Sequence, residues 1–160
     1  MDYRRWLFYL REYVFPFGCS ICGTGLLNSE EAWYGMCGHC RKVLDAEFDE
    51  GQAGNTCGRN CARCGKPLVS EHGLCLPCRN REDFILEKII VLFPYMGKYR
   101  KLLAAYKFNK NLAPAHYFAE KIFNTLGAFA IAGTFAPDGA AIVPVPPRPG
   151  KIRKTGWDQV

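Results

Sequence analysis

Apolar residues recur every three or four positions in three parts of this chain, and each part predicts a helix. The first part lies between residues 3 and 14, where charged residues occupy the other positions and a proline and a glycine follow. We expect residues 1–18 to form a short amphipathic arm that packs on the domain after it. The alternative, a surface anchor for a membrane or a partner, fits a helix of this length less well.

The other two helices are predicted after residue 96. In the first, basic residues surround one apolar face, which consists of Tyr99, Leu102, Leu103 and Tyr106. In the second, Pro114 suits the first helical turn. The stripe of this helix that we expect to be buried consists of Phe118, Ile122, Leu126 and Phe129.

Two uninterrupted apolar runs, 89–95 and 140–145, lie on either side of these helices. Apolar runs that alternate with helices favour an α/β fold, with a parallel sheet covered by helices. The second run passes into prolines at 144, 146 and 147, which cannot continue a ladder of backbone hydrogen bonds. The strand should therefore end there, at the edge of the sheet where such folds bind ligands.

Residues 19–80 have a different character, because cysteine, glycine and charged residues dominate them. A segment with so few apolar residues cannot build a core and needs another means of stabilisation. The acidic, glycine-containing stretch 45–55 interrupts the cysteines, and we interpret it as a linker between two halves, 19–44 and 57–80.

The pattern of the cysteines favours metal over disulfides. Eight of the nine cysteines fall into four C-x2-C pairs, the total is odd, and the first residues do not resemble a secretory signal. We therefore expect a protein of the reducing cytoplasm, where structural disulfides rarely persist. No apolar stretch approaches the roughly 20 residues that a membrane-spanning helix needs.

Two C-x2-C turns can complete the tetrahedral site that zinc prefers. The predicted ligands of two structural Zn²⁺ ions are Cys19, Cys22, Cys37 and Cys40 for the first, and Cys61, Cys64, Cys75 and Cys78 for the second. With four thiolates each, the sites leave no open position for metal-centred catalysis. Iron–sulfur and thiol-redox sites are the weaker alternatives.

Some details of the ligand set stay open at this stage. Cys57 is the surplus cysteine and could replace Cys61, although the closer pair is favoured. His39 and His72 could compete as ligands, but we expect both to be exposed loop residues. A cross-braced arrangement that exchanges pairs between the two sites would use the same eight cysteines.

The combination of these motifs resembles the ComF family of competence proteins. The resemblance rests on the paired cysteines, on Tyr106-Lys107-Phe108 at a helix end, on V-P-V-P at 143–146, and on R-x-x-G-aromatic-x-Q at 153–159. It implies zinc ribbons over 19–80, followed over 81–160 by an incomplete α/β domain of the type I phosphoribosyltransferase kind. It also implies a role in handling single-stranded DNA during natural transformation, with proteins of the DNA-uptake machinery as partners.

The resemblance has two departures. Thr155 stands where the family usually has arginine, and the chain has no acidic-pair loop of the D-D-x-x-T-T-G kind, which grips the ribose phosphate in such transferases. We therefore expect a fragment that stops before the phosphoribosyl pyrophosphate loop, or a version that cannot bind this ligand in the usual way. Transferase activity of this chain alone is not expected.

Three functions remain open: contact with single-stranded DNA, binding of a phosphoribosyl-type ligand, and a protein-interaction adaptor built on the zinc ribbons. The net charge of +6 agrees with a polyanionic ligand but does not require one. The residues predicted to contact phosphate or nucleic acid are Lys107, Arg148, Lys151, Arg153, Lys154, Trp157 and Gln159. Tyr99 and Tyr106 are poor candidates for base stacking, because they lie on the helix face that we expect to be buried.

Overall fold

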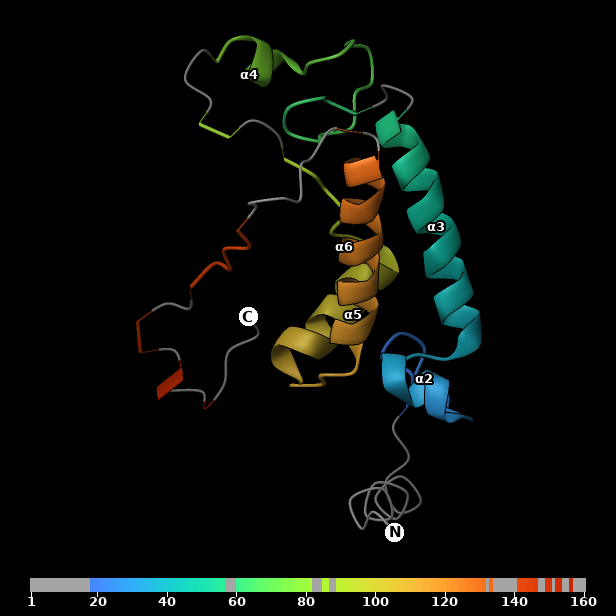
Figure 1. Ribbon diagram of the computed structural model, residues 1–160. Helices are drawn as coiled ribbons and strands as arrows, with labels where there is room; N and C mark the ends of the chain where they lie inside the picture. Colours follow the sequence, from blue (N-terminus) through green and yellow to red (C-terminus); the bar gives the residue numbers. More distant parts are fainter. Residues whose placement is uncertain are drawn as a thin grey trace.

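The computed structural model describes residues 18–56, 60–81, 85–86, 89–131, 133, 141–146, 149–150, 152–153 and 156. Residues 1–17 of the arm predicted at 1–18 lie outside the described residues, as does Cys57. The main elements are helices: α2 (Ser29–Tyr34), α3 (Gly38–Thr56), α4 (Leu76–Arg79), α5 (Gly97–Phe108) and α6 (Pro114–Ile131). Figure 1 shows α3, α5 and α6 together, with α2 beside the start of α3 and α4 apart from these helices.

The described residues contain no β-sheet. Their only β-pairings are two isolated antiparallel bridges, Gly18 with Gly25 and Asn60 with Pro67. The described residues of the apolar runs 89–95 and 140–145 form no strand and pair with none in the described part of the chain. The α/β class of the second half therefore stays a prediction.

The linker predicted at 45–55 is wrong, because these residues continue α3 as far as Thr56. Cys40, Leu44 and Phe48 follow one another at four-residue steps and are all buried, so they form an apolar stripe along α3. Two acidic residues beside this stripe, Asp45 and Glu47, form ion pairs with lysines of α6 and α5. Tertiary contacts thus support a helix in a stretch whose composition is typical of a linker.

The two helices predicted after residue 96 are confirmed. In α5, Tyr99 and Leu102 are buried as expected. In α6, however, the buried residues are Pro114, Tyr117 and Thr125. Ile122, which was predicted to be buried, is 44% exposed. Phe118, another member of the predicted stripe, does pack against the main core. The prediction is therefore wrong for Ile122, because periodicity alone does not show which apolar side of a helix packs most closely.

The main core joins the first cysteines to the helices. It contains Cys19, Ile21, Met36, Cys40, Leu44, Tyr99, Leu102 and Tyr117. Phe93 fills the space between α3, α5 and α6, with its ring centroid 5.5 Å from Phe48, 4.9 Å from Tyr99 and 5.4 Å from Phe118. Residues on both sides of position 80 therefore share one core.

The remaining cysteines form a second, smaller cluster. It consists of Cys61, Cys75 and Cys78, with Cys64, Leu68 and Leu74 packed against them. No helix of the described residues combines the length and the apolar character needed to cross a bilayer.

Candidate metal centres

Each cysteine group begins with the same backbone turn. The amide of Gly23 donates to the carbonyl of Cys19 at 2.8 Å, and the amide of Gly65 donates to that of Cys61 at 2.9 Å. Both glycines have positive φ, 79° and 71°, which side chains with a Cβ rarely adopt. Glycine therefore allows the chain to leave each turn without strain.

The flanking backbone repeats as well. The amide of Cys19 donates to the carbonyl of Thr24 at 2.7 Å, and the amide of Cys61 donates to that of Lys66 at 2.8 Å. One antiparallel bridge closes each turn. Gly18 pairs with Gly25 in the first turn, and Asn60 pairs with Pro67 in the second. The two halves are thus copies of one local structure, as the tandem cysteine pairs predict.

The second pair of each group lies at the start of a helix rather than in another hairpin turn. Cys37 directly precedes α3, and Cys75 is the N-cap of α4. The fourth cysteines, Cys40 and Cys78, lie in the first turn of the same helices. A helix N-terminus carries partial positive charge from its free N–H groups, which favours thiolates over thiols there.

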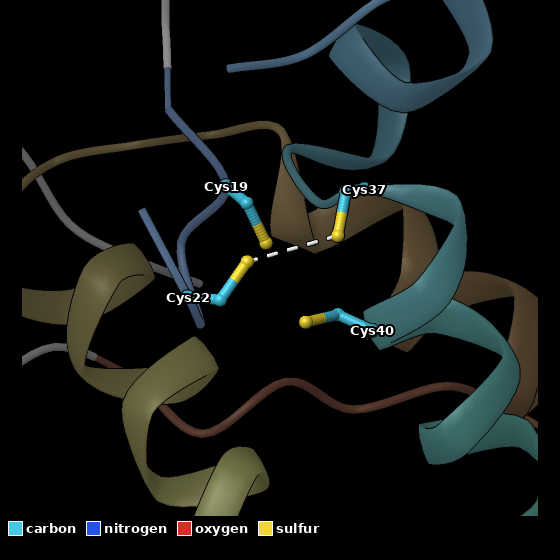
Figure 2. A group of neighbouring side chains, drawn as sticks. All are labelled: Cys19, Cys22, Cys37 and Cys40. Atoms are coloured by element: carbon cyan, nitrogen blue, oxygen red, sulfur yellow. Dashed lines mark hydrogen bonds between the residues drawn. The ribbon is translucent and has the colours of Figure 1, made fainter. Parts of the chain in front are cut away.

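The structure groups the cysteines sequentially and not in the cross-braced way. Within each quartet, all four sulfurs lie within 4.8 Å of one another. The Sγ atoms of Cys22 and Cys37 are 3.7 Å apart, and those of Cys64 and Cys75 are 3.6 Å apart. Figure 2 marks the contact between Cys22 and Cys37 with a dashed line. A tetrahedron with Zn–S bonds of about 2.3 Å requires sulfurs about 3.8 Å apart, so both quartets fit one zinc ion each.

Within each quartet, the environment lowers the pKa of one thiol and raises that of others. The hydroxyl of Thr24 lowers the pKa of Cys22 to about 6. Burial opposes ionisation of Cys61, but backbone N–H groups at its sulfur outweigh it and lower its pKa to about 6. Burial and the neighbouring sulfurs raise the pKa of Cys78 to about 12, and the pKa of Cys40 is raised for the same reasons. A divalent cation among the four sulfurs would offset this repulsion.

Two glutamates that the sequence analysis did not single out hold the helix starts in place. Oε1 of Glu31 accepts from the amide of Gly38 at 2.7 Å, and Oε1 of Glu71 accepts from the amide of Leu76 at 2.7 Å. Each donor is the residue directly after the third cysteine of its quartet. The N–H groups of Leu27 and Gly38 hold the pKa of Glu31 below its usual value. A glutamate shortly before each second C-x2-C pair was the available signal, since acidic side chains favour helix N-termini.

The structure describes only some of the other candidate residues, which are the two histidines and the residues predicted to contact phosphate or nucleic acid. His39 and His72 are exposed, and neither belongs to a quartet. Lys107 lies exposed in the last turn of α5, and Arg153 is also exposed. The remaining predicted contacts lie outside the described residues: Arg148, Lys151, Lys154, Trp157 and Gln159.

Comparison with known proteins finds no family model, no curated protein and no solved structure that matches this chain. The resemblance to the ComF family therefore rests on the sequence motifs alone. The function has to be inferred from the residues and geometry of the chain itself.

Proposed function

We propose that this chain is a ComF-like module in which two structural Zn²⁺ ions hold the fold and α5 contacts single-stranded DNA. The observation that carries the metal part is the repeated quartet, in which the same turn and the same helix start bring four sulfurs within 4.8 Å. Four thiolates complete the coordination of zinc, so each ion would stabilise the fold rather than perform catalysis. Each ion would contribute on the order of 10 kcal/mol to folding.

The solvent face of α5 supports the DNA part of the proposal. Arg100, Lys101 and Lys107 are exposed, while Tyr99 and Leu102 bury the opposite face. None of these three basic residues forms an ion pair with another described residue. Arg100 and Lys107 are two helical turns apart, or about 10 Å along the axis, so one strand could contact both through its phosphates.

Exposed aromatic rings lie at both ends of this basic face. Tyr95 is 68% exposed and its ring centroid lies 5.9 Å from the guanidinium of Arg100, while Phe108 is 75% exposed. Stacking of a base on such a ring contributes roughly 1–3 kcal/mol. Tyr99 is buried, in agreement with its predicted place on the packed face. We define the DNA-contact face as Tyr95, Arg100, Lys101, Lys107 and Phe108.

A salt titration of single-stranded DNA binding tests the proposal. We expect the affinity of the zinc-loaded chain for a labelled oligonucleotide, measured by fluorescence anisotropy, to fall as salt rises. The double variant Arg100→Gln/Lys107→Gln should bind more weakly and flatten the slope of log affinity against log salt by about 1.4, because each phosphate contact contributes about 0.7.

A matched variant removes two positive charges elsewhere. Lys42 lies on α3 and Lys66 follows the second turn, and both are exposed. Lys42→Gln/Lys66→Gln should leave the slope almost unchanged. Salt-independent binding, or an equal loss in the two double variants, would contradict a specific role for α5.

The two other functions have less support. A phosphoribosyl-type ligand was expected at the end of a strand, but the described residues 141–146 are exposed and pair with no described strand. An adaptor role rests on exposed aliphatic residues after each turn, Leu27 and Val69, without a surface that indicates the partner.

A further inference from the structure

The two quartets differ in how well the surrounding chain covers them. Cys22 is exposed, whereas Cys64, its counterpart in the second quartet, is half-buried. The glycines that follow show the same difference. A Cβ at Gly23 would meet nothing within 4 Å, whereas a Cβ at Gly65 would lie 2.8 Å from Cγ2 of Val91 and 3.3 Å from the carbonyl oxygen of Ile89.

The segment with Ile89 and Val91, which covers the turn of the second quartet, is held there by a backbone hydrogen bond. The amide of Ile89 donates to the carbonyl of Arg63, inside the turn, at 2.8 Å. The segment that carries Val91 therefore lies directly on the second turn. Small reagents dissolved in water should reach the first quartet more easily than the second.

The exposed thiol of the first quartet has a partner close by. In Figure 2 the side chain of Cys22 points toward Cys37, and the two sulfurs are 3.7 Å apart. Cys19 and Cys40, the other members, are buried. An oxidant that reaches the quartet from solvent would therefore meet Cys22 first, with Cys37 in place to resolve the product.

We propose that Cys22 is an oxidation site at which hydrogen peroxide converts the first quartet from a metal site into a Cys22–Cys37 disulfide. This inference rests on the proposed zinc binding. The Cys22 thiolate attacks the O–O bond, becomes a sulfenic acid and releases one hydroxide. The Cys37 thiolate then attacks the sulfenic sulfur, forms the S–S bond and releases a second hydroxide. The two sulfurs lose two electrons in total, which reduce one peroxide, and only Cys19 and Cys40 remain as metal ligands.

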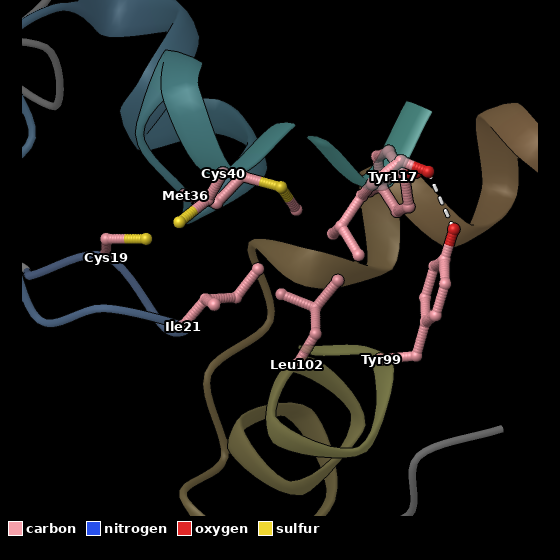
Figure 3. Packing of buried hydrophobic residues seen from close by; sticks show 8 residues of the cluster. Cys19, Ile21, Met36, Cys40, Tyr99, Leu102 and Tyr117 are labelled. Atoms are coloured by element: carbon pink, nitrogen blue, oxygen red, sulfur yellow. Dashed lines mark hydrogen bonds between the residues drawn. The ribbon is translucent and has the colours of Figure 1, made fainter. Parts of the chain in front are cut away.

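The first quartet is placed so that its loss affects the DNA-contact face. Figure 3 shows Cys19 and Cys40 in one cluster with Ile21, Leu102 and Tyr117. Leu102 belongs to α5, the helix that carries the basic residues. The second quartet shares no buried residue with this cluster. Oxidation of the first quartet should therefore loosen α5, whereas loss of the second should not.

Stepwise oxidation of the full zinc-loaded chain tests the proposal. Hydrogen peroxide is added, released zinc is followed with a chelating dye, and disulfides are located by peptide mapping. We expect one equivalent of zinc to appear about tenfold faster than the other, together with a disulfide between Cys22 and Cys37. A thiol reductant with added zinc should restore the starting state.

Val91→Ala provides the matched variant, because it thins the cover over the second turn without touching a cysteine. It should speed the release of zinc from the second quartet and leave the rate of release from the first quartet unchanged. Equal release rates, earlier oxidation of the second quartet, or a first disulfide without Cys22 would overturn the proposal. If the purified chain holds no zinc, the proposed zinc binding fails, while peptide mapping still decides whether Cys22 is the oxidation site.

Discussion

At the scale of single residues, the end of α2 lies close to the start of α6 at a glycine. Gly35 ends α2 with φ 64°. A Cβ there would lie 2.9 Å from Cβ of Ala113 and 3.2 Å from Cδ of Pro114, at the start of α6. Gly23 also has positive φ, 79°, but faces open space. Comparing substitutions at Gly35 and Gly23 therefore distinguishes the free-energy cost of a positive φ from the cost of a steric clash.

We predict that Gly35→Ala destabilises the zinc-loaded chain more than Gly23→Ala. Both variants should lose about 1 kcal/mol from the positive φ, and Gly35→Ala should lose a further 1–3 kcal/mol, roughly, because α6 must shift. Urea unfolding followed by circular dichroism measures the difference. Equal losses would mean that α2 and α6 do not approach as closely as the structure shows.

At the scale of elements, side-chain contacts of α6 with α2 and α3 stabilise the packing of these helices. The Trp33 ring of α2 stacks on the His116 ring of α6, with centroids 3.7 Å apart. The Lys121 ammonium of α6 lies 2.7 Å from Asp45 of α3 and over the rings of Phe48 and Tyr117. The Lys121 side chain is only 11% exposed, so this ion pair is shielded from solvent far better than a typical surface pair.

We predict that Lys121→Met costs about 1–3 kcal/mol of unfolding free energy, because it leaves the Asp45 carboxylate without its closest cation. Adding Asp45→Asn should recover part of the loss. The control is Lys98→Met, which removes the exposed ion pair between α5 and Glu47, 3.2 Å long, and should cost less than about 1 kcal/mol. Additive effects of Lys121→Met and Asp45→Asn in denaturant unfolding would show that the pair contributes nothing.

Some elements of the structure could be predicted from the sequence, and others could not. The two groups of four cysteines follow from their spacing alone, because two cysteines in a C-x2-C pair lie close together whatever the rest of the chain does. The positions of α5 and α6 follow from periodicity. The second half of α3 could not be predicted from its acidic residues and glycines, because its stability comes from contacts with α5 and α6, which are distant in the sequence. The burial of Tyr117 and Thr125 on α6 was missed for the same reason, since it depends on helices that are distant in the sequence.

At the scale of the whole molecule, the two quartets make unequal contributions. The first belongs to the core that α3, α5 and α6 share, so its metal would act on the packing of three helices. The second lies in a separate, smaller cluster, in which Leu68 and Leu74 are the described hydrophobic residues that pack against its cysteines. Zinc would therefore be linked to the global fold at the first quartet and to a local fold at the second.

Replacing equivalent cysteines distinguishes these two kinds of linkage. Cys64→Ser should release one zinc ion and unfold the second quartet, while the near-ultraviolet circular dichroism of the buried Tyr99 and Tyr117 stays close to that of the parent. Cys22→Ser should also release one zinc ion, but it should lower the stability of the helical core by about 4 kcal/mol or more, as expected when a metal that supports the core is lost. Metal analysis of each variant shows that the same amount of zinc has left. If both variants then preserve the tyrosine signal equally, α3, α5 and α6 pack without help from the first quartet, and the shared core would not transmit the state of its metal to α5.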